Sequence, residues 1–234
     1  IGATRKTAPI CSQSSCQARR DTGLSGETLV VIGSFDHPAA ARGSNVVDPG
    51  QLLLSCGTSW VGFFPEPDRQ RIIDAGLLCD PFLARQGAAT PGPWGAIFSV
   101  PCIGRTIDGY IANVIAPGEP DPISVFNALA AEARPGADGL VIDLRQPPGR
   151  IDADRRDISR AVMEGAARLI TEPIRTLAAR DMRFDRAVMV GGPSRSPIWP
   201  GIIEDATGIE ISVGSAHAGA IGAAMLAGAG LYAN

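Results

Sequence analysis

The sequence lacks residues on which several kinds of phosphate and carbonyl chemistry depend. Its 234 residues include one lysine, Lys6, beside twenty arginines, and only two histidines, His37 and His217. A Walker-type phosphate-binding loop and a Schiff base both need a lysine, so neither has a candidate residue outside the extreme N-terminus. The net charge of −3 argues against a surface that binds nucleic acid.

Cysteine pairs with the spacing of a metal site are also missing. The five cysteines are odd in number and form no Cys-x-x-Cys pair, which disfavours a zinc cluster and a disulfide framework. We therefore expect reduced thiols in a cytoplasmic protein. No secretory leader is visible, and the most apolar stretch, 216–232, is too short and too weakly apolar to span a membrane. The chain starts at Ile1, so we expect a fragment whose N-terminal part is missing.

Apolar residues make up 45% of the chain, enough for a core, which excludes a disordered protein. Short apolar runs, β-branched at 28–32, predict strands at 28–32, 51–56, 60–64, 96–100, 110–115, 140–144, 187–190 and 210–213. Apolar spacing and capping residues predict helices at 11–21, 37–42, 122–134, 157–181, 197–207 and 218–231. We expect Pro173 to kink or split the longest helix, and 65–95 to be irregular. The first part of the chain is rich in predicted strands, and in the later part predicted helices and strands alternate. This order predicts an α/β fold with a mixed sheet flanked by helices.

Three turns of small residues, at 33–36, 57–59 and 191–196, each follow a predicted strand. Ligands collect at strand ends in alternating α/β proteins, and glycine lets the backbone N–H groups approach a phosphate. Because no lysine is at hand, backbone amides, hydroxyl groups and Mg²⁺ would have to bind the phosphates.

Each turn also has a plain structural interpretation. Asp36 could accept a proton or hold Mg²⁺, or it could cap the short helix that follows. Gly57-Thr58-Ser59 could wrap a polyphosphate or form an ordinary hairpin turn. Gly191-Gly192 could lie against a flat ring or an α-phosphate, or serve as a tight strand-to-helix turn. For His37 we favour a structural role beside Asp36.

The order and spacing of these turns are more specific than any one of them. Together with the segments around them they resemble the C-terminal domain of the FGGY carbohydrate kinases, over residues 20–232. The segments that carry the resemblance are 22–30, 33–43, 48–59, 160–165, 190–196 and 219–228.

The resemblance implies an actin/hexokinase/Hsp70-like (ribonuclease H-like) ATPase fold, here its second domain. Residues 1–22 would be a leading segment, and 23–234 the nucleotide-binding domain. The activity implied is transfer of the γ-phosphate of ATP, with Mg²⁺, to a hydroxyl of a ketose or polyol.

The same resemblance assigns roles to the turn residues. Asp36 would be the catalytic base that takes the proton from the sugar hydroxyl. Gly57, Thr58 and Ser59 would form the β/γ-phosphate turn, and Gly191 and Gly192 would contact adenosine. Ser196 would be a polar neighbour of the adenine.

Two departures from the family bear on activity. The segment 142–157 is short and holds Arg145-Gln-Pro-Pro-Gly-Arg150, which would alter one wall of the cleft. The family's N-terminal domain is absent, and it supplies the other half of the clamp and most sugar contacts. We therefore expect the partners to be a sugar or polyol and that missing domain, with a homodimer left open, and little kinase activity from this piece alone. Two alternatives stay open: a degenerate module that binds nucleotide without phosphotransfer, and an actin/Hsp70-like ATPase module.

Overall fold

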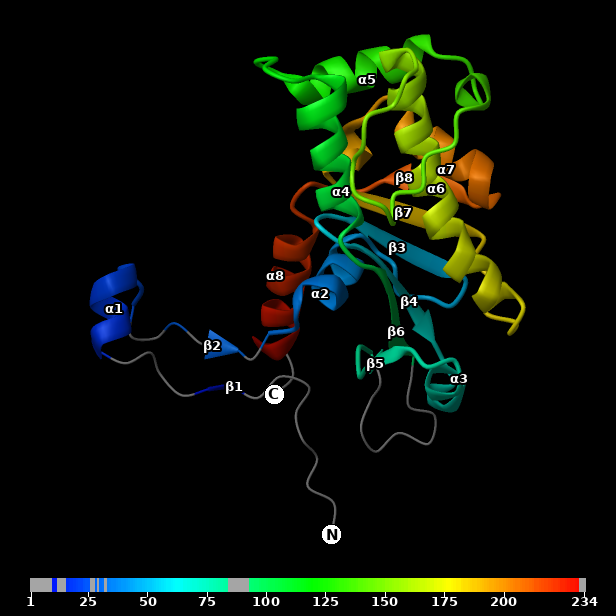
Figure 1. Ribbon diagram of the computed structural model, residues 1–234. Coiled ribbons are helices and arrows are strands. Elements are labelled where there is room, and N and C mark those ends of the chain that lie inside the picture. The colour runs from blue at the N-terminus through cyan, green and yellow to red at the C-terminus, as the bar shows by residue number, and fades with distance from the viewer. Residues whose placement is uncertain are drawn as a thin grey trace.

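A six-stranded mixed sheet forms the centre of the molecule (Figure 1). The computed structural model describes residues 10–11, 16–25, 28, 30–31, 33–83 and 93–231. In spatial order the strands are β5 (Leu78–Asp80), β6 (Trp94–Val100), β4 (Trp60–Glu66), β3 (Gln51–Cys56), β7 (Arg186–Gly191) and β8 (Glu210–Val213). The strands β5, β6, β4 and β3 pair in antiparallel fashion, whereas β3, β7 and β8 run parallel. The predicted mixed sheet and the predicted hairpin of β3 and β4 are confirmed.

Helices cover both faces of this sheet. They are α2 (Asp36–Gly43), α3 (Arg69–Asp74), α4 (Ile103–Tyr110), α5 (Pro122–Glu132), α6 (Arg155–Ala178), α7 (Trp199–Thr207) and α8 (Ala218–Leu231). The helix α1 (Cys16–Thr22) lies apart with the two-stranded sheet of β1 (Ile10–Cys11) and β2 (Val30–Val31) (Figure 1). No helix among the described residues is long and apolar enough to cross a lipid bilayer.

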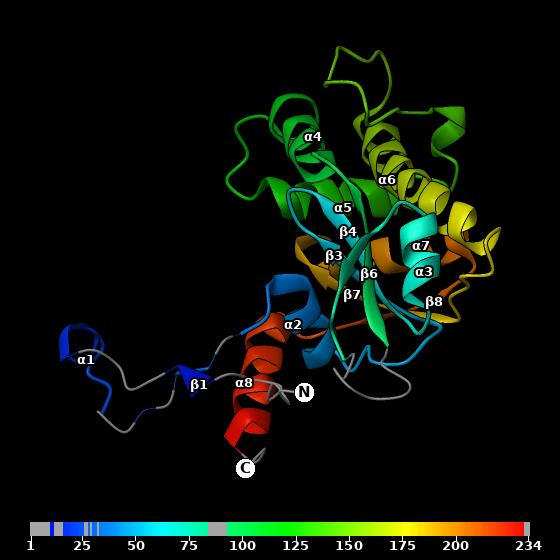
Figure 2. The same cartoon turned by 90° about the horizontal axis from the view of Figure 1, so that it is seen from below.

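The alternation of residues along β3 divides the core in two. Leu52 and Leu54 pack into a large cluster beneath α4, α5, α6 and α7, whereas Leu53 joins a smaller cluster with residues of α2. Successive side chains of a strand point to opposite faces, so one strand serves both clusters. The helices α2 and α8, from opposite ends of the chain, lie side by side in both views (Figures 1 and 2), and both contribute residues to the smaller cluster.

Capping residues set the starts of the two main helices over the large cluster. The Asp121 carboxylate accepts a hydrogen bond from the backbone N–H of Ser124, and Pro122 occupies the first turn of α5 as predicted. The Asp154 carboxylate does the same for α6 through Arg156. Of the two effects predicted for Pro173, a split of the longest helix is wrong, and a kink stays a prediction. The helix α6 continues through Pro173 to Ala178, because Ile174 beyond the proline is buried in the core.

The predicted strand at 110–115 is helical instead. The helix α4 runs into a π-helix over Ile111–Ile115. Ile103, Ile107 and Ile111 recur every four residues and are all buried, so the segment presents one apolar stripe to the core. Its β-branched residues favour a strand locally, but tertiary packing overrides that preference.

Three other predictions need correction. The strand at 140–144 does not form, because the Ile142 carbonyl accepts a hydrogen bond from Arg168 of α6 rather than from a neighbouring strand. The segment 65–95 is not irregular throughout, since it contains α3, β5 and the start of β6. The strand expected at 28–32 is described only at Val30–Val31, which pairs with β1 outside the central sheet; residues 29 and 32 lie outside the described part.

Candidate nucleotide site at the ends of β3 and β7

Two of the three predicted turns leave neighbouring parallel strands at the same edge of the sheet. Cys56, the last residue of β3, lies opposite Gly191, the last residue of β7. The segment 57–59 follows the first strand, and a short 3-10 helix over Gly192–Arg195 follows the second. The chain thus brings two glycine turns that are far apart in sequence to adjacent positions. In open α/β sheets, this carboxyl edge is where ligands bind.

Gly191 is required by the closeness of the two strands. Its φ of +102° lies in the region that favours glycine, and a Cβ there would stand 2.2 Å from the Cys56 carbonyl oxygen. Around Gly57 and Gly192 the space is open. An added Cβ would meet no atom within 4 Å at Gly192, and none nearer than 3.7 Å at Gly57. The backbone at both turns can therefore be approached closely by a flat or anionic ligand.

The turn at 57–59 is held in shape by the start of α4, which the sequence did not predict. The Gly104 N–H donates to the Thr58 carbonyl at 3.0 Å, and the Cys102 N–H donates to the Ser59 hydroxyl oxygen at 3.2 Å. A Cβ on Gly104 would lie 2.1 Å from the Gly57 carbonyl oxygen, so this contact needs a glycine. Thr58 itself is exposed. The hydrogen bond from Gly104 to Thr58 joins residues 46 positions apart in the sequence, so no local motif predicts it.

The turn at 191–196 is closed by its own serines. The Ser194 hydroxyl donates to the Gly191 carbonyl at 2.8 Å. The Ser196 hydroxyl oxygen accepts from the backbone N–H of Trp199 at 3.3 Å, at the start of α7. Ser196 is buried, so here it supports the start of the helix. Its contact with adenine stays a prediction.

Asp36 is the first residue of α2 and leaves its side chain largely in solvent, 80% exposed. Its carboxylate accepts a hydrogen bond from the His37 N–H at 3.0 Å, and the His37 ring nitrogen Nε2 lies 3.8 Å from the same oxygen. The alternative that Asp36 is the N-cap is wrong, since Phe35 holds that position and makes no side-chain cap. The carboxylate is therefore accessible, while its placement opposite the two turns stays a prediction.

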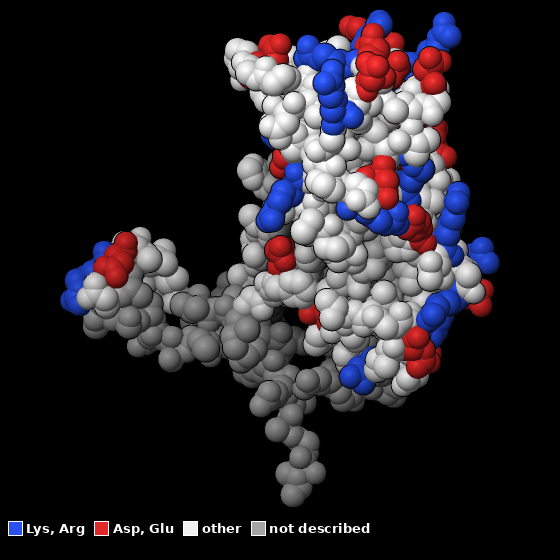
Figure 3. Space-filling model, viewed as in Figure 1, with Lys and Arg blue, Asp and Glu red and all other residues white. Residues whose placement is uncertain are grey.

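The two turns differ in charge: the second contains the exposed Arg195, whereas a buried thiol precedes the first. Burial raises the pKa of the Cys56 thiol, so this end of β3 carries a neutral thiol rather than a thiolate. On the face seen in Figure 3, arginines and acidic residues are interspersed. No group of three or more His, Cys, Asp or Glu residues suited to a metal ion occurs in the described part of the chain. Mg²⁺ commonly binds through one or two carboxylates plus substrate phosphates, so the exposed carboxylate of Asp36 fits that kind of coordination.

Two cavities lie away from these turns. One, of about 320 Å³, is at the opposite end of β3 and β4 and includes Gly50 and Glu66 in its lining. The other, of about 580 Å³, lies between Gly109 of α4 and the loop around Pro148. None of the predicted site residues lines either of them.

Solved structures of sugar kinases share this architecture. The xylulose kinase from Rhodospirillum rubrum matches with a TM-score of 0.73 at 24% identity, over 94% of this chain and 46% of that one. The glycerol kinase from Plasmodium falciparum, solved with ADP, gives a TM-score of 0.73 at 16% identity, over 97% of this chain and 47% of that one. The protein thus has the fold of the actin/hexokinase-like ATPases, as predicted.

Sequence comparisons find similarity to the same class of protein. The model of the FGGY family of carbohydrate kinases, C-terminal domain, matches residues 120–231. The ribulokinase from Mycolicibacterium smegmatis is 25% identical over 240 residues, which cover 92% of this chain and 42% of that protein. Over residues 120–231 the chain is therefore similar to the C-terminal domain of the FGGY carbohydrate kinases. It spans less than half the length of these relatives.

Proposed function

We propose that this chain is the nucleotide-side half of an ATP-dependent kinase that phosphorylates a hydroxyl group of a sugar or polyol. The observation that carries the proposal is the pairing of β3 with β7, which sets the turns at 57–59 and 191–192 side by side. The relatives named above, a ribulokinase, a xylulose kinase and a glycerol kinase, support the class of substrate.

In this proposal the two turns divide the nucleotide between them. The backbone amides of Thr58 and Ser59 and the exposed Thr58 hydroxyl would bind the β- and γ-phosphates, beside the open backbone of Gly57, whose own N–H donates to the Ser59 carbonyl. The backbone at Gly191 and Gly192, which is open at Gly192, would lie against adenosine. When bound, Mg²⁺ supplies neutralisation of the phosphate charge.

Asp36 would then act as the general base. As the acceptor oxygen forms its bond to the γ-phosphorus, the bond between that phosphorus and the β–γ bridging oxygen breaks. The hydroxyl proton passes to the Asp36 carboxylate, and ADP leaves. The exposure of this carboxylate supports its availability to a substrate, but a base in open water would catalyse poorly. The site therefore needs a cover.

We propose that the cover is the N-terminal half found in the longer relatives, and that it packs on α8. This helix has no polar residue, yet it exposes Ile221 and Met225. A helix that is apolar on all sides is normally buried. Because α8 packs against α2, a domain seated on α8 would lie beside the helix that begins with Asp36. Without that half, we expect this chain to bind nucleotide and to show little phosphotransfer.

The test is ATP-dependent phosphorylation of a panel of ketoses and polyols by the full-length gene product. We expect sugar-dependent ADP release, and a loss of about 10²- to 10⁴-fold in kcat for Asp36→Asn. Asp205→Asn, at an exposed position on α7, is the control and should leave kcat unchanged. Hydrolysis of ATP that does not depend on sugar would instead identify an actin/Hsp70-like ATPase. No turnover of any kind would indicate a degenerate module.

A further inference from the structure

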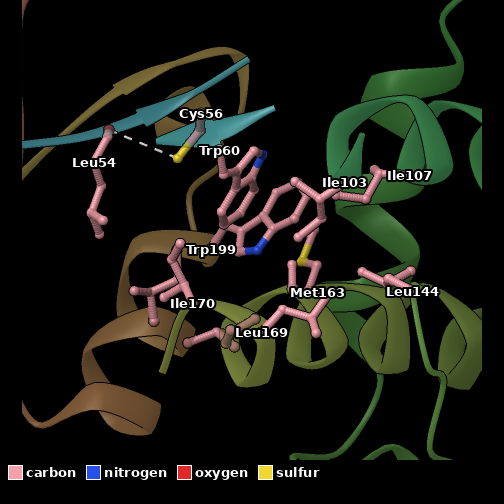
Figure 4. Close-up of a cluster of buried hydrophobic side chains, with 14 of the residues drawn as sticks. Leu54, Cys56, Trp60, Ile103, Ile107, Leu144, Met163, Leu169, Ile170 and Trp199 are labelled. Carbon is pink, nitrogen blue, oxygen red and sulfur yellow. Dashed lines mark hydrogen bonds between the residues drawn. The ribbon is translucent and has the colours of Figure 1, made fainter. Parts of the chain in front are cut away.

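Two tryptophans in the large core cluster lie next to the two turns of the candidate site and contact each other. Trp60 is the first residue of β4 and follows the turn at 57–59 directly. Trp199 is the first residue of α7 and follows the turn at 191–196. Their ring centroids lie 5.5 Å apart with the planes tilted by 54°, and both side chains are buried (Figure 4). Phe126 of α5 packs edge-on against Trp199 at 5.6 Å.

This pair is held by packing rather than by hydrogen bonds. The indole N–H groups of Trp60 and Trp199 are buried and have no hydrogen-bond partner among the described residues. A buried donor without a partner is unfavourable, so phenylalanine would serve a purely structural core better at this place. Compared with phenylalanine, an indole has a larger contact area. Its wider ring system reaches from the end of one strand towards the end of the other.

We infer that Trp60 and Trp199 are positioning residues that fix the separation of the two turns for an adenine nucleotide. The inference rests on the proposed function, because it concerns the same site. Each indole is one to three residues from a turn, and the Ser196 hydroxyl that caps Trp199 belongs to the second turn. A shift of one ring against the other would therefore change the distance between the phosphate turn and the adenosine turn.

A ligand that spans both turns should sense this distance, and a ligand that occupies one turn should not. ADP with Mg²⁺ reaches both turns, whereas adenosine and inorganic pyrophosphate each occupy one. The affinity that ADP gains by joining its two parts depends on the match between its length and the separation of the sites.

The experiment is calorimetric titration of the chain with these three ligands. We expect Trp60→Phe and Trp199→Phe to weaken ADP binding roughly tenfold each, and to change adenosine and pyrophosphate binding by less than about twofold. The double variant should bind ADP as tightly as whichever single variant has the lower affinity for ADP, because the two rings act as one unit. Trp94→Phe is the matched control: Trp94 pairs with Glu66 at the far end of β4 from Trp60, so ADP binding should be unchanged.

The outcomes separate the two levels of the proposal. If the wild-type chain binds ADP and both Phe variants bind it equally well, the positioning role is overturned while nucleotide binding stands. If the variants weaken all three ligands alike, the indoles are core residues and the positioning role is again overturned. If the wild-type chain fails to bind ADP, the proposed function is overturned and the positioning role with it. Thermal melting of each variant confirms that it is folded.

Discussion

The two faces of the central sheet are covered in different ways. On one face, α4, α5, α6 and α7 bury a large cluster that includes Phe126 and Met163. On the other face, α2 and the beginning of α8 cover the smaller cluster around Phe63. Beyond Ala218 the helix α8 follows α2 and exposes Ile221. The first face is completed by this chain, whereas the second has apolar surface left over, so we expect stability to come from the first and assembly from the second.

The largest effect should follow from damage to the completed face. Phe126→Ala removes a ring that is 1% exposed and contacts Trp199, and it should cost about 3–5 kcal/mol of unfolding free energy. Ile123→Ala on the same helix is the control, since Ile123 is 52% exposed and should cost less than about 0.5 kcal/mol. Denaturant titration measures both values. Equal costs would mean that α5 is not part of the main core.

A second prediction concerns the contact between α2 and α8. A Cβ on Gly222 would lie 1.7 Å from the Ala39 carbonyl oxygen, so Gly222→Ala must push the helices apart. Overpacking of this kind typically costs about 1–3 kcal/mol. Hydrogen exchange should accelerate in α2 and α8 and stay unchanged in α6.

Gly219→Ala is the matched control for that variant. An added Cβ at Gly219 meets no atom within 4 Å, and alanine favours the helix over glycine by up to about 1 kcal/mol. The variant should therefore be as stable as the wild type or more so. Faster exchange in α6 of Gly222→Ala would show that the two faces unfold as one unit, against the division drawn above.

The sequence predicts the individual strands and helices better than it predicts the contacts between them. The hairpin of β3 and β4, the strands β7 and β8 and the helix α8 follow from local patterns and glycine positions. The segment 110–115 was missed because its β-branched residues conceal a helical stripe that extends from Ile103. Local sequence also gave no sign that the Gly104 N–H would hold the Thr58 carbonyl, since that contact joins segments more than forty residues apart. Likewise, the position of Asp36 relative to the turns depends on packing that no short motif encodes.

The smallest effect on stability should come from the exposed residues of α8, and it gives the sharpest test of the difference between the faces. Ile221→Glu places a charge where the side chain is already 42% exposed, so the unfolding free energy of the chain should change by less than about 0.5 kcal/mol. In the full-length protein the same change should separate the two halves, because a buried charge without a partner is strongly unfavourable. Val141→Glu, at a residue 72% exposed in the segment between α5 and α6, is the control and should leave both properties unaltered. Limited proteolysis of the full-length variants reports the separation. If Ile221→Glu and the wild type resist proteolysis equally, α8 stays exposed in the whole protein. The N-terminal half would then have to pack on another surface.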